Sequence, residues 1–344
     1  MSDSNYNVYV NRGFTADEYD NISKYEENIA SPSYKEYRKK WLEYPKKQIL
    51  GKGPIHIDID PTNFCNLRCK MCPITVIKKE KKEKTHIMDF DLYKKIIDEA
   101  ADLGVPSVKF GILTESLVHP KIVEMVEYAN AKNFEDIGIV TNATLLTEEL
   151  ARRLIKAGLK KINISFDSPV KETYEAIRIG ADFDKTVNNI KRLIEIRNEM
   201  GSQTPLLRVT MVKMKENEEE RQLFKDLFEP YADRIAFLDY EEYDEALAAK
   251  NNTIESKAFE NFACAELWQR LVFDCHGMVT PCCSGTIYRD FTWDFKELGM
   301  AAIWSEKVQC LRQAFLNNNW KTIPMCKKCI NRVADVSAVK EGKV

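Results

Sequence analysis

Short apolar runs alternate with amphipathic stretches between residues 53 and 245. The apolar runs are rich in Val, Ile and Phe, which is typical of buried strands. The stretches between them place apolar residues three and four positions apart, as in helices that bury one face. We therefore expect six strands, at residues 55–59, 107–110, 136–140, 161–166, 206–212 and 234–238.

Signals at the ends of the expected helices support this reading. Thr147 precedes two glutamates and is a candidate N-cap, while Gly104, Gly158 and Gly201 stand where helices should end. Six strand–helix units in succession predict a parallel sheet covered by helices, two fewer than a closed barrel needs. The predicted fold class is α/β: a partial (β/α)6 barrel with an N-terminal helical extension and a small C-terminal cysteine-rich α+β cluster domain.

The pattern changes on both sides of this region. Residues 1–52 are charged and rich in tyrosine, with a helical stretch near residues 31–44, and form the expected N-terminal extension. Residues 53–245 form the expected barrel. Residues 246–344 begin with a linker of helical character and continue with short strands, turns and cysteines. Because little apolar periodicity remains there, we expect a small domain stabilised by metal.

Composition and charge exclude several classes of partner. The 344 residues are 44% apolar, and 51 basic against 53 acidic residues give a net charge of −2. This balance leaves no basic footprint for nucleic acid. No apolar run is long enough for a transmembrane helix, and the N-terminus lacks the order of a signal peptide. We expect a cytoplasmic protein with no membrane and no nucleic-acid partner.

The ten cysteines fall into two groups. Cys65, Cys69 and Cys72 follow the first expected strand, and the other seven all lie after residue 260. A reducing compartment disfavours structural disulfides, so two separate metal sites explain this segregation best. The loop after a strand is also where parallel α/β folds place their active sites.

Three thiols on one loop suit an iron–sulfur cluster with an open iron. Such clusters normally take four thiolates, so three leave one iron free for chemistry. His86, fourteen residues beyond Cys72, could contribute a fourth ligand. A zinc site completed from elsewhere in the chain is the alternative.

This Cys65-x3-Cys69-x2-Cys72 motif after a first strand resembles the radical S-adenosylmethionine (SAM) superfamily. In that family SAM chelates the open iron, and the reduced [4Fe-4S] cluster cleaves it to methionine and a 5′-deoxyadenosyl radical. The resemblance implies that Cys65, Cys69 and Cys72 are the cluster ligands. It also implies that Met71 lines the adenine, where the family usually has an aromatic residue.

Four further segments resemble the family's SAM pocket in the correct order: residues 109–120, 139–146, 163–169 and 174–180. A carboxylate suits the SAM ammonium, which the resemblance assigns to Glu115. Thr114 and Ser116 replace the family's usual Gly and Pro. Turn capping is the alternative for Asn142 and Ser165, and a solvated helix position for Arg178. The expected cofactor-binding residues are Glu115, Thr114, Thr141, Asn142, Ser165, Arg178 and Met71.

The C-terminal spacing Cys264-x12-Gly277-x4-Cys282, followed by Cys326-x2-Cys329, resembles the SPASM and twitch extensions of radical SAM enzymes. Residues 271–283 supply two strands around a turn at His276 and Gly277, as in a hairpin. The resemblance implies a second, auxiliary [4Fe-4S] cluster held by Cys264, Cys282, Cys326 and Cys329. A structural zinc site with four cysteines is the alternative.

Three cysteines remain outside both sets. Cys310 lies at helical spacing, which predicts a core position. Neighbouring residues on a strand face opposite ways, so Cys283 would point away from Cys282 and toward a substrate cavity. Some radical SAM epimerases return a hydrogen atom from a free cysteine, which makes Cys283, or alternatively Cys275, a candidate catalytic donor. A buried inert thiol is the other interpretation of each.

The sequence thus predicts an enzyme, a radical SAM oxidoreductase or epimerase. It would take hydrogen from a small polar, carbohydrate-like substrate and receive electrons from a reducing partner such as flavodoxin or ferredoxin. One alternative is a peptide-modifying maturase, and another is a non-catalytic iron–sulfur or zinc protein. A nucleic-acid-modifying enzyme needs a basic face, which the acidic stretch at residues 239–245 argues against.

Overall fold

The structure is a computed structural model that describes residues 7–9, 14–20, 30–75, 84–240 and 262–333. Its strands are β1 (Asn7–Tyr9), β2 (Phe14–Asp20), β3 (His56–Ile59), β4 (Ser107–Phe110), β5 (Asp136–Thr141), β6 (Lys161–Ser165), β7 (Leu206–Lys213), β8 (Arg234–Asp239), β9 (Phe262–Cys264), β10 (Arg270–Phe273), β11 (Met278–Thr280) and β12 (Trp293–Asp294). The six expected strands are β3 to β8, each within a residue or two of its predicted bounds.

Ten of these strands form one sheet in the order β12-β11-β10-β3-β4-β5-β6-β7-β8-β2. All neighbours from β10 to β8 run parallel, whereas β11, β12 and β2 are antiparallel to their neighbours. The outermost strands, β12 and β2, are not paired with each other in the described sheet, so the barrel is open, as expected. β1 pairs separately with β9.

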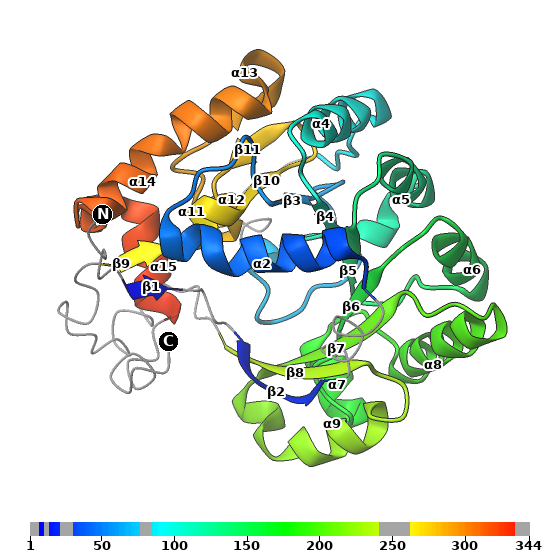
Figure 1. The fold of residues 1–344 in the computed structure, drawn as a ribbon. Helices are drawn as coiled ribbons and strands as arrows, with labels where there is room; N and C mark the ends of the chain where they lie inside the picture. The colour runs from blue at the N-terminus through cyan, green and yellow to red at the C-terminus, as the bar shows by residue number, and fades with distance from the viewer. Residues whose placement is uncertain (1–6, 10–13, 21–29, 76–83, 241–261, 334–344) are drawn as a thin grey trace.

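The helices are α2 (Pro32–Lys47), α4 (Phe90–Asp102), α5 (Ile122–Ala131), α6 (Glu148–Lys156), α7 (Lys171–Ile177), α8 (Phe183–Glu199), α9 (Arg221–Phe228), α11 (Glu266–Gln269), α12 (Cys283–Tyr288), α13 (Phe295–Ala302), α14 (Gln309–Leu316) and α15 (Pro324–Val333). The helices α4, α5, α6, α8 and α9 line the outside of the curved sheet (Figure 1). The caps behave as predicted: the Thr147 hydroxyl accepts from Leu150 N, and Gly158 takes a φ of 93° after α6.

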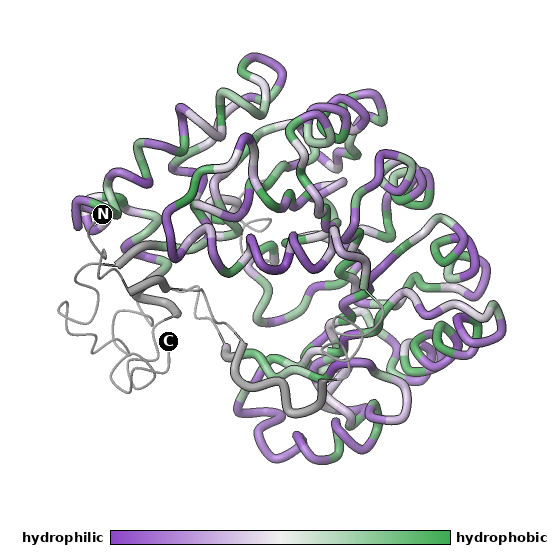
Figure 2. The backbone as a smooth tube through the Cα atoms, viewed as in Figure 1, coloured by the Kyte–Doolittle hydropathy of each residue, from purple (hydrophilic) through white to green (hydrophobic). Residues whose placement is uncertain are grey.

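The two faces of the sheet differ in chemistry. On β3, Ile57 and Ile59 join the apolar core beneath the outer helices, whereas His56 and Asp58 face the lumen of the barrel. Asp58 is fully buried there and pairs with Lys109 at 3.0 Å and with Arg270 at 3.0 Å. Along the outer helices, hydrophobic and hydrophilic residues follow one another, as expected for helices that bury one side (Figure 2).

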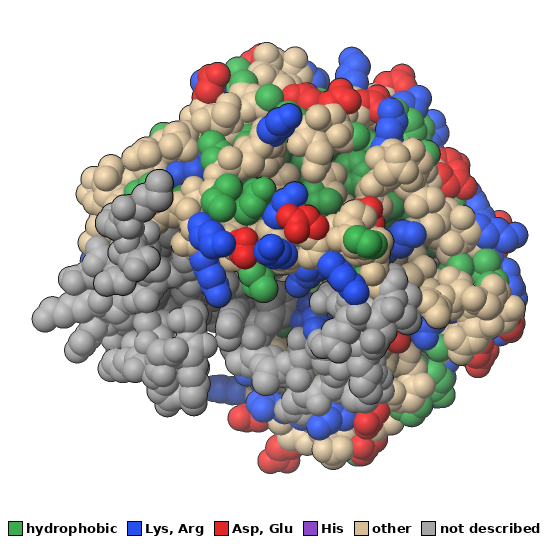
Figure 3. Space-filling model, viewed as in Figure 1, with side chains coloured by type: hydrophobic (Ala, Val, Ile, Leu, Met, Phe, Trp, Pro, Cys, Tyr) green, Lys and Arg blue, Asp and Glu red, His purple; other side chains and the backbone are tan. Residues whose placement is uncertain are grey.

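Helix α2 closes the amino-terminal edge of the sheet (Figure 1). The Trp41 ring meets His56 edge-on at 5.7 Å, and Lys161 Nζ donates to the Tyr34 hydroxyl at 2.6 Å. Tyr37, on the apolar side of α2, packs with Ile55, which directly precedes β3, in a second small core. The outer side of α2 carries interspersed acidic and basic side chains (Figure 3). Because α2 covers this edge, the carboxyl edge of the strands is the side on which a site can form.

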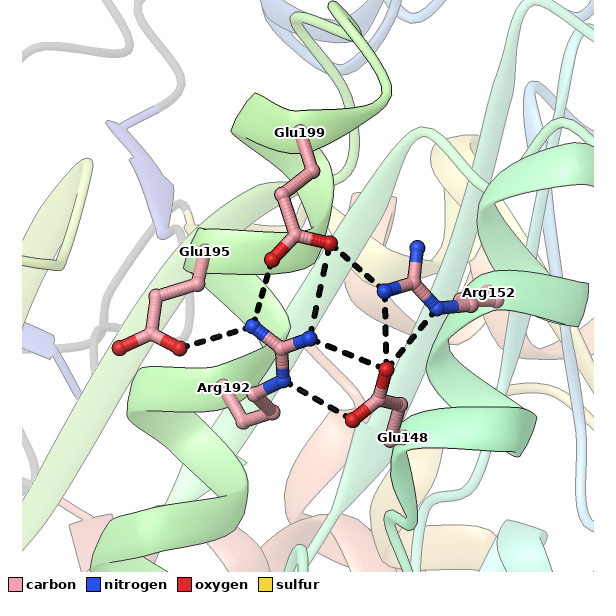
Figure 4. A network of polar contacts seen from close by, with 5 residues as sticks. All are labelled: Glu148, Arg152, Arg192, Glu195 and Glu199. Atoms are coloured by element: carbon pink, nitrogen blue, oxygen red, sulfur yellow. Dashed lines mark hydrogen bonds and ion pairs between the residues drawn. The ribbon is translucent and has the colours of Figure 1, made fainter.

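A network of charged side chains on the surface joins α6 to α8 (Figure 4). Arg192 pairs with Glu148 at 3.0 Å and with Glu199 at 2.7 Å, and Arg152 bridges the same two carboxylates. Such exposed pairs stabilise a fold only weakly, so the buried core dominates.

Three findings differ from the sequence expectations or add to them. The N-terminal extension contributes β1 and β2 in addition to the expected helix. The C-terminal hairpin formed by β10 and β11 is present, but β10 also pairs in parallel with β3 and so continues the barrel sheet. The helical linker expected from residue 246 onward falls in residues 241–261, which lie outside the described residues.

Candidate active site at the carboxyl edge of the sheet

The loop that carries Cys65, Cys69 and Cys72 leaves β3 at the carboxyl edge of the sheet. Arg68 N donates to Ile179 O at 2.9 Å, and Lys70 N donates to Ile177 O at 3.1 Å. These two bonds hold the loop against the end of α7, so its path does not depend on the sulfur atoms alone.

The three thiols face one another in a half-buried site. The pKa of Cys72 is raised to about 11, mainly by burial and to a smaller extent by the nearby Cys69 and Cys65 sulfurs. Leu67 N donates to Cys65 Sγ at 3.5 Å, and Asn142 Nδ2 lies 3.9 Å from the same sulfur. N–H donors beside the thiols suit metal binding, because they stabilise the thiolate that a bound metal requires.

Glu115 lies beside this loop, between the ends of β4 and β5. Its side chain is only 2% exposed. Oε1 accepts from the Thr141 hydroxyl at 2.7 Å and from Leu117 N at 3.0 Å, while Oε2 accepts from Asn142 N at 2.8 Å. Counting the described donors, Oε2 keeps one lone pair for a further donor. Burial raises the pKa of this carboxyl.

Arg178 is buried at the end of α7 and is not the solvated helix residue of the alternative interpretation. Its Nη2 lies 2.7 Å from Asp167 Oδ2, and Asp167 also accepts from Val212 N at 2.9 Å. Within the described part of the chain, Arg178 Nε is buried and has no hydrogen-bond acceptor. Its charge acts on Cys69, whose pKa it lowers against the larger effect of burial. The guanidinium is therefore placed for an anionic group beside the cysteine loop.

The remaining predicted pocket residues occupy the same edge. Asn142 caps its own turn, because its Oδ1 accepts from Thr144 N at 3.0 Å, while its amide group faces Cys65. Ser165 is half-buried at the end of β6, and Met71 is half-buried in the cysteine loop. The Thr114 hydroxyl does not contact Glu115 but donates to Asp60 Oδ1 at 3.0 Å.

The four predicted C-terminal ligands also gather in one place. Burial raises the pKa of Cys264 and of Cys282 well above the ordinary value, and the sulfurs of Cys326 and Cys329 raise both further. Ser284 Oγ donates to Cys329 Sγ at 3.2 Å. These residues come from β9, the N-cap of α12, and α15, which lie far apart in the sequence.

The spacing of the sulfur atoms bears on the kind of metal site. Among the residues that the structure describes, the ligand atoms of His86, Cys275 and His276 lie within 4.8 Å of one another, and neither cysteine set forms such a group. A single zinc ion needs its ligands that close. A cubane cluster binds each thiolate through a different iron and holds them farther apart. The arrangement of both cysteine sets is compatible with a cubane cluster.

The ring of His86 stacks on that of His276 with centroids 4.0 Å apart, so His86 lies beside the C-terminal hairpin. Two expectations are wrong. Cys310 is exposed on α14, where its sulfur faces Lys307 O, and is not a core residue. Cys283 begins α12 with Cys282 as its N-cap, so the strand argument that aimed Cys283 at a cavity fails.

A cavity of about 60 Å³ opens at this edge, between β3, β4 and the hairpin formed by β10 and β11. Asp60, Thr114, Cys275 and His276 line it, whereas Cys283 is not among its lining residues. Burial raises the pKa of Asp60 to about 6, against the opposing effect of the N–H of Ile112, which donates at 2.7 Å. The sequence analysis missed Asp60, although it directly follows the first strand.

The open parallel sheet, the cysteine loop at its carboxyl edge and the buried Glu115 beside that loop can be compared with known families. Residues 59–227 match the model described as "Radical SAM superfamily". The chain belongs to the radical SAM superfamily. Members of this family use a [4Fe-4S] cluster and SAM, and the matched residues include the cysteine loop, Glu115 and Arg178.

Curated radical SAM relatives match over part of their length. Over 164 residues the chain is 32% identical to the "Tungsten-containing aldehyde ferredoxin oxidoreductase cofactor-modifying protein" of Pyrococcus furiosus, which covers 47% of this chain and 44% of that protein. Over 192 residues it is 30% identical to the "GTP 3′,8-cyclase" of Clostridium botulinum, which covers 55% of this chain and 57% of that protein. The match thus spans about half the length of these relatives.

Solved radical SAM structures share the fold more widely. Streptococcus suis SuiB bound to precursor peptide SuiA has a TM-score of 0.61 at 17% identity, covering 83% of this chain and 73% of that chain. BtrN in complex with AdoMet and 2-DOIA has a TM-score of 0.52 at 18% identity, covering 81% and 93%. Native anSMEcpe with bound AdoMet has a TM-score of 0.55 at 15% identity, covering 81% and 91%. These likenesses concern the fold alone.

A search of the described helices finds none that is both long and apolar enough to cross a membrane.

Proposed function

We propose that this radical SAM enzyme oxidises an alcohol group of a small polar, carbohydrate-like substrate bound in the Asp60 cavity. The observation that carries the proposal is the position of this cavity, beside the cysteine loop and bordered by an ionisable carboxylate. BtrN, which shares the fold, was solved with 2-DOIA.

The chain's own residues fit the family's cofactors. Cys65, Cys69 and Cys72 would hold the [4Fe-4S] cluster, the spare lone pair of Glu115 Oε2 suits an ammonium group, and Arg178 Nε suits a carboxylate. Thr141 and Asn142 orient Glu115 by donating to it. Met71 and Ser165 would border the bound SAM. When bound, SAM and the reduced cluster supply a radical that removes a hydrogen atom from the substrate.

Asp60 has the properties of a proton acceptor for the oxidation. With a pKa of about 6 it is mostly ionised at neutral pH, yet it remains basic enough to take a proton from a hydroxyl group whose carbon has lost hydrogen. Three donors from the turn after β4 fix its oxygens, namely Ile112 N, Leu113 N and the Thr114 hydroxyl. They hold the carboxylate in place while it faces the cavity.

Oxidation also needs an acceptor for the second electron. We propose that residues 246–344 form an auxiliary domain, in which Cys264, Cys282, Cys326 and Cys329 hold a second [4Fe-4S] cluster that supplies this acceptor. The sulfurs of Cys326 and Cys329 act on the pKa values of both Cys264 and Cys282, which supports one shared site for the four thiols. A cytoplasmic reductant such as flavodoxin or ferredoxin would provide the electron that starts each cycle.

Two other outcomes have specific support. Epimerisation needs a thiol hydrogen, and Cys275 lines the cavity with a pKa that burial raises to about 12, so without a metal it carries its proton. Cys283, the first choice from the sequence, has no such position. Peptide modification is favoured by the likeness to SuiB, solved with a precursor peptide, and to anSMEcpe, solved with the Cp18Cys peptide.

The test incubates the dithionite-reduced protein with SAM and a panel of polyols, aminosugars and peptides in D₂O. The proposal predicts that a polyol or aminosugar accelerates 5′-deoxyadenosine release and loses two hydrogens. A product of unchanged composition that gains one deuterium would indicate epimerisation. Acceleration by peptides alone would overturn the proposal in favour of a maturase.

A further inference from the structure

Two imidazoles and a thiol converge beside the cavity, outside both cysteine sets. The rings of His86 and His276 stack with centroids 4.0 Å apart and planes 23° apart. One ligand atom from each of these residues and Cys275 Sγ all lie within 4.8 Å of one another. Imidazole nitrogen and thiolate sulfur are the ligands that borderline-soft divalent metals such as zinc prefer.

The backbone at His86 is fixed by the start of the cysteine loop. His86 N donates to Asn63 Oδ1 at 2.8 Å, and His86 O accepts from the Thr62 hydroxyl at 2.8 Å and from Asn63 N at 3.2 Å. Asn63 Nδ2 also donates to Lys84 O at 2.9 Å. These four bonds position His86 without help from its side chain.

The turn that carries Cys275 and His276 is equally constrained. Asp274 Oδ1 accepts from His276 N at 2.9 Å and from Met278 N at 3.0 Å. Gly277 has a φ of 86°, and a Cβ there would lie 3.3 Å from the Leu92 side chain, so only glycine fits without strain. The hairpin therefore presents both ligands in one orientation.

The separations suit a single ion after small rotations. Zinc bonds of about 2.0 Å to nitrogen and 2.3 Å to sulfur place tetrahedral ligands about 3.3–3.6 Å apart. The two imidazoles are exposed and can turn by the remaining ångström, whereas Cys275 is only 1% exposed and held in place.

Two of the three ligands also line the Asp60 cavity. A zinc site with three protein ligands leaves one coordination position open. Because Cys275 and His276 border the cavity, an ion held by them lies at its edge, within reach of a bound molecule.

We propose that His86, Cys275 and His276 bind a single divalent zinc ion whose open position takes an oxygen atom of the substrate. Metal binding follows from the three ligands alone, whereas the substrate oxygen rests on the proposed function. A hydroxyl on zinc releases its proton more readily, and Asp60 lines the same cavity to accept that proton. A zinc-bound sulfur carries no hydrogen, so an occupied site excludes Cys275 as hydrogen-atom donor and favours oxidation.

The test loads the iron–sulfur-reconstituted protein with zinc under anaerobic conditions, removes excess metal, and measures zinc and iron content. Zinc X-ray absorption then identifies the ligands. The variants are His86→Ala/His276→Ala and Cys275→Ser, with Cys310→Ser as the matched control because Cys310 is exposed and lies outside the site. An unchanged iron content shows that each variant has folded.

The proposal predicts about one zinc ion per wild-type chain, with two nitrogen ligands, one sulfur ligand and a light fourth ligand. The double-histidine variant should bind zinc more than about 100-fold more weakly. This loss exceeds the effect of removing only a residue that hydrogen-bonds to a metal ligand. Cys275→Ser should lose the sulfur signal, and Cys310→Ser should keep it. Equal zinc content in the double-histidine variant, or a ligand shell of sulfur alone, would overturn the site. Neither readout depends on SAM cleavage, so failure of the proposed function would be seen separately.

Discussion

Arg178 Nη2 and Asp167 Oδ2 form a buried ion pair at 2.7 Å beside the Cys69 sulfur. The pair joins the end of α7 to the end of β6 and lies under the cysteine loop. It shows how the fold prepares this edge for charged ligands: one donor of the guanidinium is used for structure, and Nε remains for a ligand.

Breaking this pair should destabilise the protein strongly. Arg178→Ala leaves the buried Asp167 carboxylate without its partner, which costs about 3–5 kcal/mol. Chemical denaturation of the variant and of Arg221→Ala, a control at the start of α9, measures the difference. A loss below about 1 kcal/mol for Arg178→Ala would mean that the pair contributes no more than a surface contact does.

Glu115→Gln should weaken SAM binding while leaving the cluster in place. The substitution keeps the shape of the side chain but removes the negative charge, and it replaces one acceptor oxygen with an NH2 donor that faces the donors from Thr141, Leu117 and Asn142. A charged hydrogen bond is worth about 1.5–3 kcal/mol, so we expect affinity to fall about 10- to 150-fold. Equilibrium binding of SAM checks this, with the exposed Glu127→Gln as control. Equal affinities would remove Glu115 from the SAM pocket.

Activity should depend on the ionisation of Asp60. Burial raises its pKa from 3.8 to about 6 in the folded protein, so the ionised form, which accepts the proton, is lost as pH falls through 6. Substrate-dependent turnover should rise from pH 5 to 7 and then level off, and Asp60→Asn should abolish this rise. If turnover of the Asp60→Asn variant still rose between pH 5 and 7, Asp60 would be excluded as the proton acceptor.

Ionisation of Asp60 should favour activity but lower the stability of the folded protein. Since the folded-state pKa lies above the unfolded value, the folded state binds the proton more tightly than the unfolded state does. Ionised Asp60 therefore lowers stability at neutral pH, and this cost disappears as pH falls below about 4. Asp60→Asn should make the protein less sensitive to pH between 4 and 6 in denaturation experiments.

The packing of α2 should matter for stability and not for the cluster. Tyr37 is 4% exposed and meets Tyr34 and Trp41 edge-on at 5.7 and 6.1 Å. Tyr37→Ala should cost about 3 kcal/mol through the cavity that it leaves, with the iron content unchanged. Leu42→Ala on the exposed side of the same helix should cost less than about 0.5 kcal/mol. Similar losses for both variants would mean that α2 does not close the barrel.

The sequence located the local features well. The apolar runs predicted all six barrel strands, because a strand buried on one face and lined with helices has a pattern visible in a few residues. The cap at Thr147 and the glycine at Gly158 act locally and were equally readable. The resemblance to the radical SAM pocket implied that Glu115, Thr141 and Arg178 share one site, and the rule that parallel strands share their carboxyl ends agrees with it for Glu115 and Thr141.

Long-range pairing and side-chain direction were beyond the sequence pattern. Nothing in residues 270–273 indicates that they pair with β3, more than two hundred residues earlier, yet that pairing brings Cys275 beside Asp60. Cys283 was expected at the end of the second hairpin strand, but the chain turns into α12 there. His86 and His276 meet only because two loops fold together.

The most direct test of the central claim is anaerobic reconstitution followed by iron and sulfide analysis, reduction, and quantification of 5′-deoxyadenosine after SAM is added. Two clusters predict about eight irons per chain, with deoxyadenosine release that a Cys65/Cys69/Cys72→Ala variant loses together with about half of its iron. A Cys326/Cys329→Ala variant should keep SAM cleavage with the remaining half. Protein that takes up zinc in both cysteine sets without iron, or clusters that never cleave SAM, would contradict the claim.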